Sequence, residues 1–339
     1  RTERRREKKL GNASVVEVAG AGTFGGSDEA MVKLKGTEAG AWLVHFLLPG
    51  TWLLGTPLVV ATIVAAWSLQ WYRLLTVALL AGTWQLVLPL PAWPGFLPFL
   101  EQLRGGLYYA KCELHLLAPI PRENALVCYH PHGVLSASFS FNGVVNETFR
   151  GTTFFVAGAV FCLPCFSVVL RFLGNVRSAD AATLRQFMKR GKNCALLPGG
   201  FEEATLTRVG RDRVFLKDRM GFVKFALRYG YKLQPAYTFG EADLYWTFPF
   251  FEKLRLKLNH FKVPGVVFFG NPFFPPFPRR SGELVTVVGE PLDLPHIADP
   301  SDDDVRKWHA AYTASLVALF DAHKASLGGY PATRQLEVC

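Results

Sequence analysis

The stretch that decides the fold is LVCYHPHG at residues 126–133, in which an apolar run ends in two histidines separated by a proline and followed by a glycine. A short apolar run bounded by turn residues predicts a buried strand, so His130 and His132 should lie where the strand gives way to a loop. Catalytic groups are often carried by such loops. Histidine changes charge near neutral pH without help, so either ring is a candidate base for a hydroxyl proton.

A second stretch, ALLPGGFEE at residues 195–203, repeats this design with carboxylates in place of histidines. An apolar strand breaks at Pro198, Gly199 and Gly200 and is followed by Glu202 and Glu203. In open α/β sheets, ligands bind beyond the carboxyl ends of the strands. Two strand ends that carry histidine and glutamate therefore predict a base and the acid that orients it.

Short apolar runs alternate with amphipathic segments from about residue 104 onward, which predicts an α/β domain. The expected strands are 125–129, 153–157, 193–197, 233–239, 265–269 and 284–288. Helices are expected between them, one capped by Ser178 and ending at Gly191, and another ending at Gly230. A long amphipathic helix over 305–320 should pack on the core rather than on a membrane.

Two uncharged segments precede this domain. Residues 39–72 contain no Asp, Glu, Lys or Arg, and after Arg73 the next charged residue is Glu101. Each segment exceeds the ~20 apolar residues that cross a hydrocarbon core as a helix. The short link between them predicts a membrane hairpin, and the basic residues before it place both ends in the cytoplasm. Because prolines break the second segment, an embedded hairpin that does not cross is the alternative.

The chain is thus divided into a largely flexible tail (1–40), a transmembrane or embedded hairpin (41–100) and a cytosol-facing, membrane-associated domain (101–339). A net charge of +10 suits an anionic membrane face or a polyanionic substrate. Nucleic acid is not an expected partner, because the basic residues form no known nucleic-acid motif. The six cysteines lie mostly in apolar runs, as buried, reduced thiols do.

Weaker motifs point to other chemistry. Residues 20–25, GAGTFG, spell a dinucleotide-binding fingerprint, but no convincing helix follows them. Cys162 and Cys165, with His130 and His132, could supply four zinc ligands. Packing of both thiols around Pro164 is the favoured interpretation, so no metal site is predicted. The sequence has no G-x-S-x-G elbow and no Walker loop, which disfavours a serine hydrolase or a P-loop enzyme.

Several ordered blocks together resemble the diacylglycerol acyltransferase 2 family, which includes monoacylglycerol and wax-alcohol acyltransferases. They are HPHG, PGG followed by Glu203, and residues 219–222, 235–241 and 288–291, in the same order and at similar spacing. The resemblance runs from the apolar segments to the final helix. It implies a glycerolipid-acyltransferase-like mixed sheet flanked by helices, behind an N-terminal membrane-embedded helical hairpin.

The resemblance also implies an activity. A fatty acyl group would pass from acyl-CoA to the free hydroxyl of diacylglycerol, with acyl-CoA as substrate and no resident cofactor. His132 is implied to be the base, His130 a supporting residue and Glu203 the carboxylate. The aspartate that follows the histidine in related glycerophosphate acyltransferases is replaced by Ala137. The residues expected to contact substrate are Gly133, Pro198, Gly199, Gly200, Arg219 and Glu241.

The family resemblance places the protein in the endoplasmic reticulum membrane and at the lipid-droplet surface, with the catalytic domain facing the cytosol. A homo-oligomer is compatible with this arrangement. Monoacylglycerol or a long-chain alcohol is the alternative acceptor, because acceptor choice depends on pocket shape rather than on a motif. A non-catalytic lipid-droplet protein anchored by its hairpin is the alternative from another class, and a metal hydrolase is the third.

Overall fold

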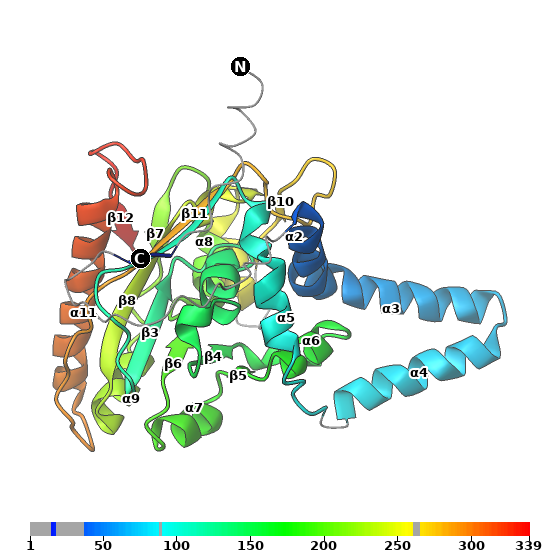
Figure 1. Cartoon of the computed structure of the whole chain (residues 1–339), viewed down its shortest axis with the longest axis horizontal. Helices are drawn as coiled ribbons and strands as arrows, with labels where there is room; N and C mark the ends of the chain where they lie inside the picture. The colour runs from blue at the N-terminus through cyan, green and yellow to red at the C-terminus, as the bar shows by residue number, and fades with distance from the viewer. Residues whose placement is uncertain (1–14, 18–36, 88–89, 260–264) are drawn as a thin grey trace, which may run out of the picture.

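The computed structural model describes residues 15–17, 37–87, 90–259 and 265–339. These residues form one eight-stranded sheet with helices on both faces (Figure 1). Its strands, in spatial order, are β1 (Val15–Glu17), β2 (Lys111–Leu116), β11 (Glu283–Val288), β8 (Lys232–Phe239), β3 (Ala125–His130), β6 (Cys194–Leu196), β4 (Thr153–Val156) and β5 (Val176–Ser178). Two short pairs lie outside it: β9 (Trp246–Thr247) with β10 (Phe268–Phe269), and β7 (Asp212–Val214) with β12 (Leu336–Val338).

The sheet is mixed. β11 pairs antiparallel with β8, and every other neighbouring pair in it is parallel. The central strand β3 lies between β8 and β6, with Val127 opposite Ala195 of β6. Since β3 and β6 are parallel neighbours, their carboxyl ends meet at one edge, as the two sequence motifs predict.

The helices are α2 (Glu38–His45), α3 (Thr51–Ser68), α4 (Tyr72–Val87), α5 (Phe96–Leu103), α6 (Phe166–Leu173), α7 (Ala181–Met188), α8 (Gly200–Leu206), α9 (Gly221–Tyr229), α10 (Glu252–Leu258) and α11 (Asp302–His323). α7, α9 and α11 share one hydrophobic core with the sheet, and α2, α5 and α6 share a second core with its other face. Figure 1 shows α11 and α5 on opposite sides of the sheet.

Strand β3 connects the two cores. Leu126 and Cys128 pack in the core with α11, whereas Val127 and Tyr129 pack in the core with α2 and α5. Successive side chains of a strand point to opposite faces, and a strand covered on both faces is apolar throughout. All six residues of β3 are accordingly buried, so the predicted strand is confirmed.

Three predicted helices are present with small differences at their ends. α9 ends at Tyr229 and is capped by Gly230, whose φ of +68° suits a residue without a side chain. α11 begins with a capping box between Ser301 and Asp304 and buries its apolar stripe against the sheet, so it belongs to the core as expected. α7 is capped by the Asp180 carboxylate, which accepts from the next turn, and not by Ser178, which ends β5.

The apolar segments form α3 and α4, which project together from the α/β body (Figure 1). Within the described residues, Glu38–Ser68 is one helical run long and apolar enough to cross a membrane, judged by length and composition. Its first part does not project: Ala41, Val44 and Leu48 pack in the core with α5 and α6. α4 does not meet this criterion over its described residues, and membrane crossing by either segment stays a prediction.

Other predictions from the sequence differ from the structure or lie outside the described residues. The strand expected at 265–269 shrinks to Phe268–Phe269 and pairs with β9 outside the main sheet. β2 and β5 were not predicted, because their alternating polar residues or short length leave no apolar run. The dinucleotide-like residues 20–25, and all of the tail except 15–17 and 37–40, lie outside the described residues.

Candidate active site

The two strand-end motifs lie side by side. β3 leads into His130, Pro131, His132 and Gly133, and β6 leads through Pro198 into α8. Because the strands are parallel neighbours, the histidine loop and the glutamate-bearing helix start from the same edge of the sheet. A carboxylate on the first turn of α8 can therefore reach the backbone of the histidine loop.

Glu203 makes this connection. Its side chain is 1% exposed; Oε1 accepts a hydrogen bond from the His132 backbone N–H (2.5 Å), and Oε2 accepts one from the Phe215 N–H (2.7 Å). Burial alone would raise its pKa, but the neighbouring His130 and the Phe215 amide outweigh burial and lower it. Glu203 is thus a buried carboxylate that holds two loops together.

His130 is completely buried on the α11 side of β3. Its Nε2 lies 3.0 Å from the Tyr312 hydroxyl, and its Nδ1 lies 3.7 Å from Glu203 Oε1. The second distance is too long for a hydrogen bond, although a charged ring there would attract the carboxylate. The ring is no part of the wall of the cavity described next, so its place is that of a support behind the loop.

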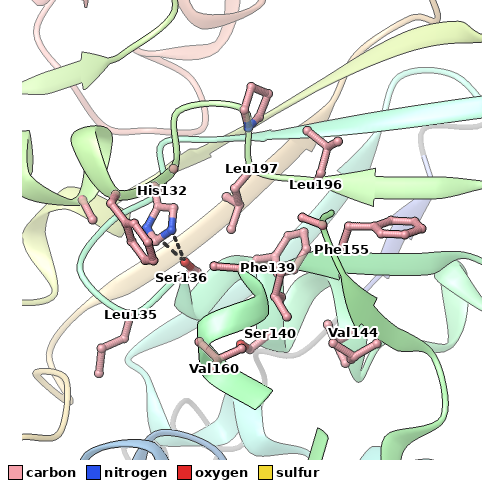
Figure 2. Close-up of a pocket in the computed structure, with 18 of the residues that line it drawn as sticks. His132, Leu135, Ser136, Phe139, Ser140, Val144, Phe155, Val160, Leu196 and Leu197 are labelled. Atoms are coloured by element: carbon pink, nitrogen blue, oxygen red, sulfur yellow. Dashed lines mark hydrogen bonds between the residues drawn. The ribbon is translucent and has the colours of Figure 1, made fainter. Parts of the chain in front are cut away.

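His132 faces a cavity of about 500 Å³. Its Nδ1 lies 3.0 Å from the Gly133 carbonyl oxygen, and burial lowers the pKa of the ring. Figure 2 shows the ring and the Ser136 hydroxyl turned toward each other at the cavity wall. Of the two histidines in the motif, the second is therefore placed to meet a ligand.

The cavity wall is mainly apolar. Around His132 it includes Leu135, Phe139, Val144, Phe155, Val160 and Leu196 (Figure 2). Leu48, Pro49 and Trp52, from the start of the candidate membrane helix, close part of the wall. A cavity of this size and lining suits an alkyl chain, with a few polar groups to fix its reactive end.

Gly133 and Glu241 contact each other behind this wall. Gly133 has a φ of +63°, and a Cβ added there would collide with the Glu241 carboxyl group. That carboxylate accepts hydrogen bonds from the Ala137 N–H (3.0 Å) and the Ser138 N–H (2.8 Å). Burial raises the pKa of Glu241 to about 7 despite these bonds. Both residues shape the histidine loop from behind, although sequence reasoning assigned them to substrate binding.

The other predicted substrate contacts are divided. Pro198, Gly200 and Arg219 are part of the cavity wall, whereas Gly199 packs against Glu203 behind it. Arg219 forms an ion pair with Glu202, and its guanidinium lies 5.4 Å from the centre of the Phe215 ring. An anion at this position would therefore compete with Glu202 for the arginine.

Three groups at the site were missed from the sequence. They are the Ser136 hydroxyl beside His132, the Tyr312 hydroxyl beside His130, and the Phe215 amide beside Glu203. Ser136 follows His132 at the spacing of one helical turn, which is a signal that could have been read. Tyr312 and Phe215 come from distant segments, and nothing local in the sequence connects them to the motifs.

The four-ligand zinc alternative is not formed. Among the described residues, no group of three or more His, Cys, Asp or Glu side chains is arranged to hold a metal ion. Cys162 is exposed at the end of a short helical turn, whereas His130 is buried against α11. Over the described residues, the cysteine pair and the two histidines thus do not converge on one metal position.

Comparison with known proteins shows which family the chain belongs to. A family model described as diacylglycerol acyltransferase matches residues 109–338, which include both motifs and all of the main sheet except β1. The chain belongs to the diacylglycerol acyltransferase family. It is an acyltransferase, and the family resemblance of its sequence motifs is confirmed.

Named relatives of this acyltransferase differ in the acceptor that their names give. It is 35% identical over 243 residues to the human diacylglycerol O-acyltransferase 2-like protein 6, covering 64% of this chain and 71% of the relative. It is 33% identical over 236 residues to mouse acyl-CoA wax alcohol acyltransferase 2, covering 61% and 68%. A Thermotoga maritima 1-acyl-sn-glycerophosphate acyltransferase structure aligns at 15% identity and a TM-score of 0.39, over 64% of this chain and 77% of that one.

Gly133→Ala tests whether the contact with Glu241 shapes the loop. The new methyl group must displace a buried carboxylate. We therefore expect a larger loss of stability than from Gly151→Ala, because φ is also positive there (+87°) but an added Cβ would meet no described atom within 4 Å beyond its chain neighbours. The difference should be at least ~1 kcal/mol in the free energy of unfolding, measured by denaturation of both purified variants in detergent. Equal losses at the two glycines would contradict the contact.

Proposed function

We propose that this acyltransferase transfers a fatty acyl group from acyl-CoA to the free hydroxyl of diacylglycerol, forming triacylglycerol. The observation that carries the proposal is the position of His132, whose ring faces an apolar cavity that the candidate membrane helix helps to close. A lipid acceptor and an acyl thioester can both bring their reactive groups to such a place. Acyl-CoA is a substrate here, and the proposal invokes no resident cofactor.

His132 acts as the general base. A carbonyl oxygen can only accept, so the contact with Gly133 assigns the proton to Nδ1 and leaves a lone pair on Nε2. Nε2 takes the proton of the acceptor hydroxyl while the hydroxyl oxygen attacks the thioester carbonyl. The C–S bond then breaks, and the coenzyme A thiolate takes the proton from the imidazolium. The acceptor oxygen bonds directly to the acyl carbon, so this route needs no covalent acyl-enzyme.

Glu203 supports the base through the backbone. Its hydrogen bond to the His132 N–H fixes the position of the residue, and its negative charge favours the imidazolium that forms during transfer. His130 lies 3.7 Å from the same carboxylate oxygen, and the Tyr312 hydroxyl contacts the other nitrogen of its ring. The Gly200 amide, beside the cavity at the start of α8, is our candidate for holding the developing oxyanion.

Arg219 is our candidate for binding the phosphates of coenzyme A. It is the arginine of the cavity wall, and its side chain is 35% exposed. Arginine forms paired hydrogen bonds with phosphate oxygens, and a phosphate carries more charge than the Glu202 carboxylate that it would displace. The acyl chain would then extend into the apolar part of the cavity.

A wax alcohol or a monoacylglycerol is the second candidate acceptor. The mouse relative is named a wax alcohol acyltransferase, and the cavity wall beside His132 carries few polar groups that could select a glycerol backbone. Initial rates of the purified protein with diacylglycerol, monoacylglycerol and a long-chain alcohol distinguish these acceptors. The highest kcat/KM identifies the preferred one.

We also propose that the protein works embedded in the endoplasmic reticulum membrane and at the lipid-droplet surface, with its catalytic domain facing the cytosol. Large apolar side chains on α3 and α4 are exposed, among them Trp67 (67%) and Leu80 (65%). Phe273 (89%) and Phe274 extend this apolar surface, and the Phe274 ring lies 6.2 Å from that of Trp42 at the base of the candidate span. Lipid contact would cover this surface.

Replacing the base provides the direct test. We expect His132→Ala to lower triacylglycerol formation from oleoyl-CoA and diacylglycerol ~100- to 10,000-fold, because a general base contributes that much to rate. Product formation and coenzyme A release are measured together on protein that still folds. His296→Ala, which removes an exposed imidazole away from the cavity, is the control. Undiminished transfer by His132→Ala would remove the assignment.

The pH profile gives an independent check. Burial lowers the pKa of His132 below its ordinary value of 6.5, and protonation removes the base. We therefore expect kcat/KM to reach half of its plateau below pH 6.5. Glu241 cannot mimic this loss: its raised pKa stabilises the folded protein at low pH, and this stabilisation is lost as the pH rises through about 7. A half-maximum above pH ~7 would contradict a neutral buried base.

Charge reversal tests the phosphate contact. We expect Arg219→Glu to raise the KM for oleoyl-CoA roughly 10-fold or more, the size of one lost hydrogen-bonded charge contact, with a smaller effect from Arg219→Gln. Arg190→Glu makes the same charge change at an exposed position at the end of α7 and should leave KM near the wild-type value. Equal KM values for all these proteins would show that Arg219 does not bind the phosphates.

A further inference from the structure

Ser136 combines an unusual backbone with a contact to the base. It is a non-glycine residue with φ of +52°, it is 6% exposed, and it is part of the cavity wall. Its hydroxyl oxygen lies 3.2 Å from Nδ1 and 3.4 Å from Nε2 of His132 (Figure 2). The hydroxyl is therefore within reach of both ring nitrogens, and its longer contact is with Nε2, the nitrogen that is free to accept a proton.

The backbone after Ser136 is held in this conformation by Glu241. The next two amides, of Ala137 and Ser138, both donate to its carboxylate. Left-handed backbone is unfavourable for a residue with a side chain and persists where the surroundings over-determine it, often at functional sites. Here the clamp keeps the Ser136 side chain turned toward His132.

Other nearby hydroxyls lack this combination. Ser140 is also part of the cavity wall, but no hydrogen bond joins its hydroxyl to His132 among the described residues. The Ser138 hydroxyl is buried and lies outside the wall. A strained turn that presents a serine beside a histidine is also how serine hydrolases expose their nucleophile. Ser136 is thus the serine of the cavity wall whose hydroxyl lies beside the proposed base, His132.

We propose that Ser136 is a nucleophile that accepts the acyl group from acyl-CoA when no lipid acceptor is bound, which gives this acyltransferase an acyl-CoA hydrolase activity. His132 Nε2 takes the serine proton, the serine oxygen bonds to the acyl carbon, and the C–S bond breaks; the leaving thiolate takes the proton from the imidazolium. Water, activated by the same ring, then hydrolyses the acyl-serine ester. This inference rests on the proposed role of His132 as base.

Two measurements on the purified full chain test it. The protein is incubated with oleoyl-CoA without acceptor, quenched in acid and digested, and oleoyl-modified peptides are mapped by mass spectrometry. A long-chain alkyl fluorophosphonate, which reacts irreversibly with activated serines and releases fluoride, is mapped in the same way. The variants are Ser136→Ala, with Ser140→Ala as a matched serine of the same cavity and His132→Ala as the loss of the base.

We expect one or both adducts on Ser136 in the wild type and in Ser140→Ala, and neither in Ser136→Ala or His132→Ala. Release of coenzyme A without acceptor should fall ~10-fold or more in Ser136→Ala, since water must then attack the thioester directly. Absence of both adducts from Ser136, or adducts that survive in Ser136→Ala, would overturn the inference. Transfer to diacylglycerol without an adduct leaves the proposed function standing, whereas an adduct without transfer to any lipid acceptor refutes that function alone.

Discussion

The site depends on one buried carboxylate. Glu203 accepts hydrogen bonds from the His132 and Phe215 amides and so joins the loop after β3, the start of α8 and the segment after β7. A buried charge is expensive unless its oxygens are satisfied, and these two bonds satisfy both of them. Gly199 packs against the same side chain, where no Cβ would fit. Gly199 is thus explained by the space that this carboxylate needs, and Gly200 by its φ of +58°.

The sequence predicts which segments meet but not how their side chains turn. Apolar runs identify β3 and β6, and the rule for strand ends places histidine and glutamate at one edge of the sheet. The period of two along a strand would put His130 and His132 on one face. β3 ends at His130, however, and the turn that follows sends His132 to the cavity while His130 stays against Tyr312 of α11. This difference follows from tertiary packing, which local patterns do not encode.

Glu241 shows the same limit for a carboxylate. In the sequence it stands after a strand and a glycine, as a ligand-binding residue would. In the fold it lies behind the histidine loop, where its partners are the Ala137 and Ser138 amides. Backbone amides look alike in any sequence, so a side chain that binds them cannot be told from one that binds a substrate. At α7, likewise, the amides of the first turn are bound by Asp180 and not by Ser178, the cap that the sequence predicted.

The candidate membrane helix has a second role, because its residues Leu48, Pro49 and Trp52 also close part of the chamber that His132 faces. A water-soluble fragment that starts after α4 would lack one side of this chamber and lose whatever seal it gives the reacting thioester. In the membrane-embedded state that we propose, bilayer thickness and lateral pressure would act on that same side. The shape of the chamber would then be coupled to the physical state of the lipid around the helix.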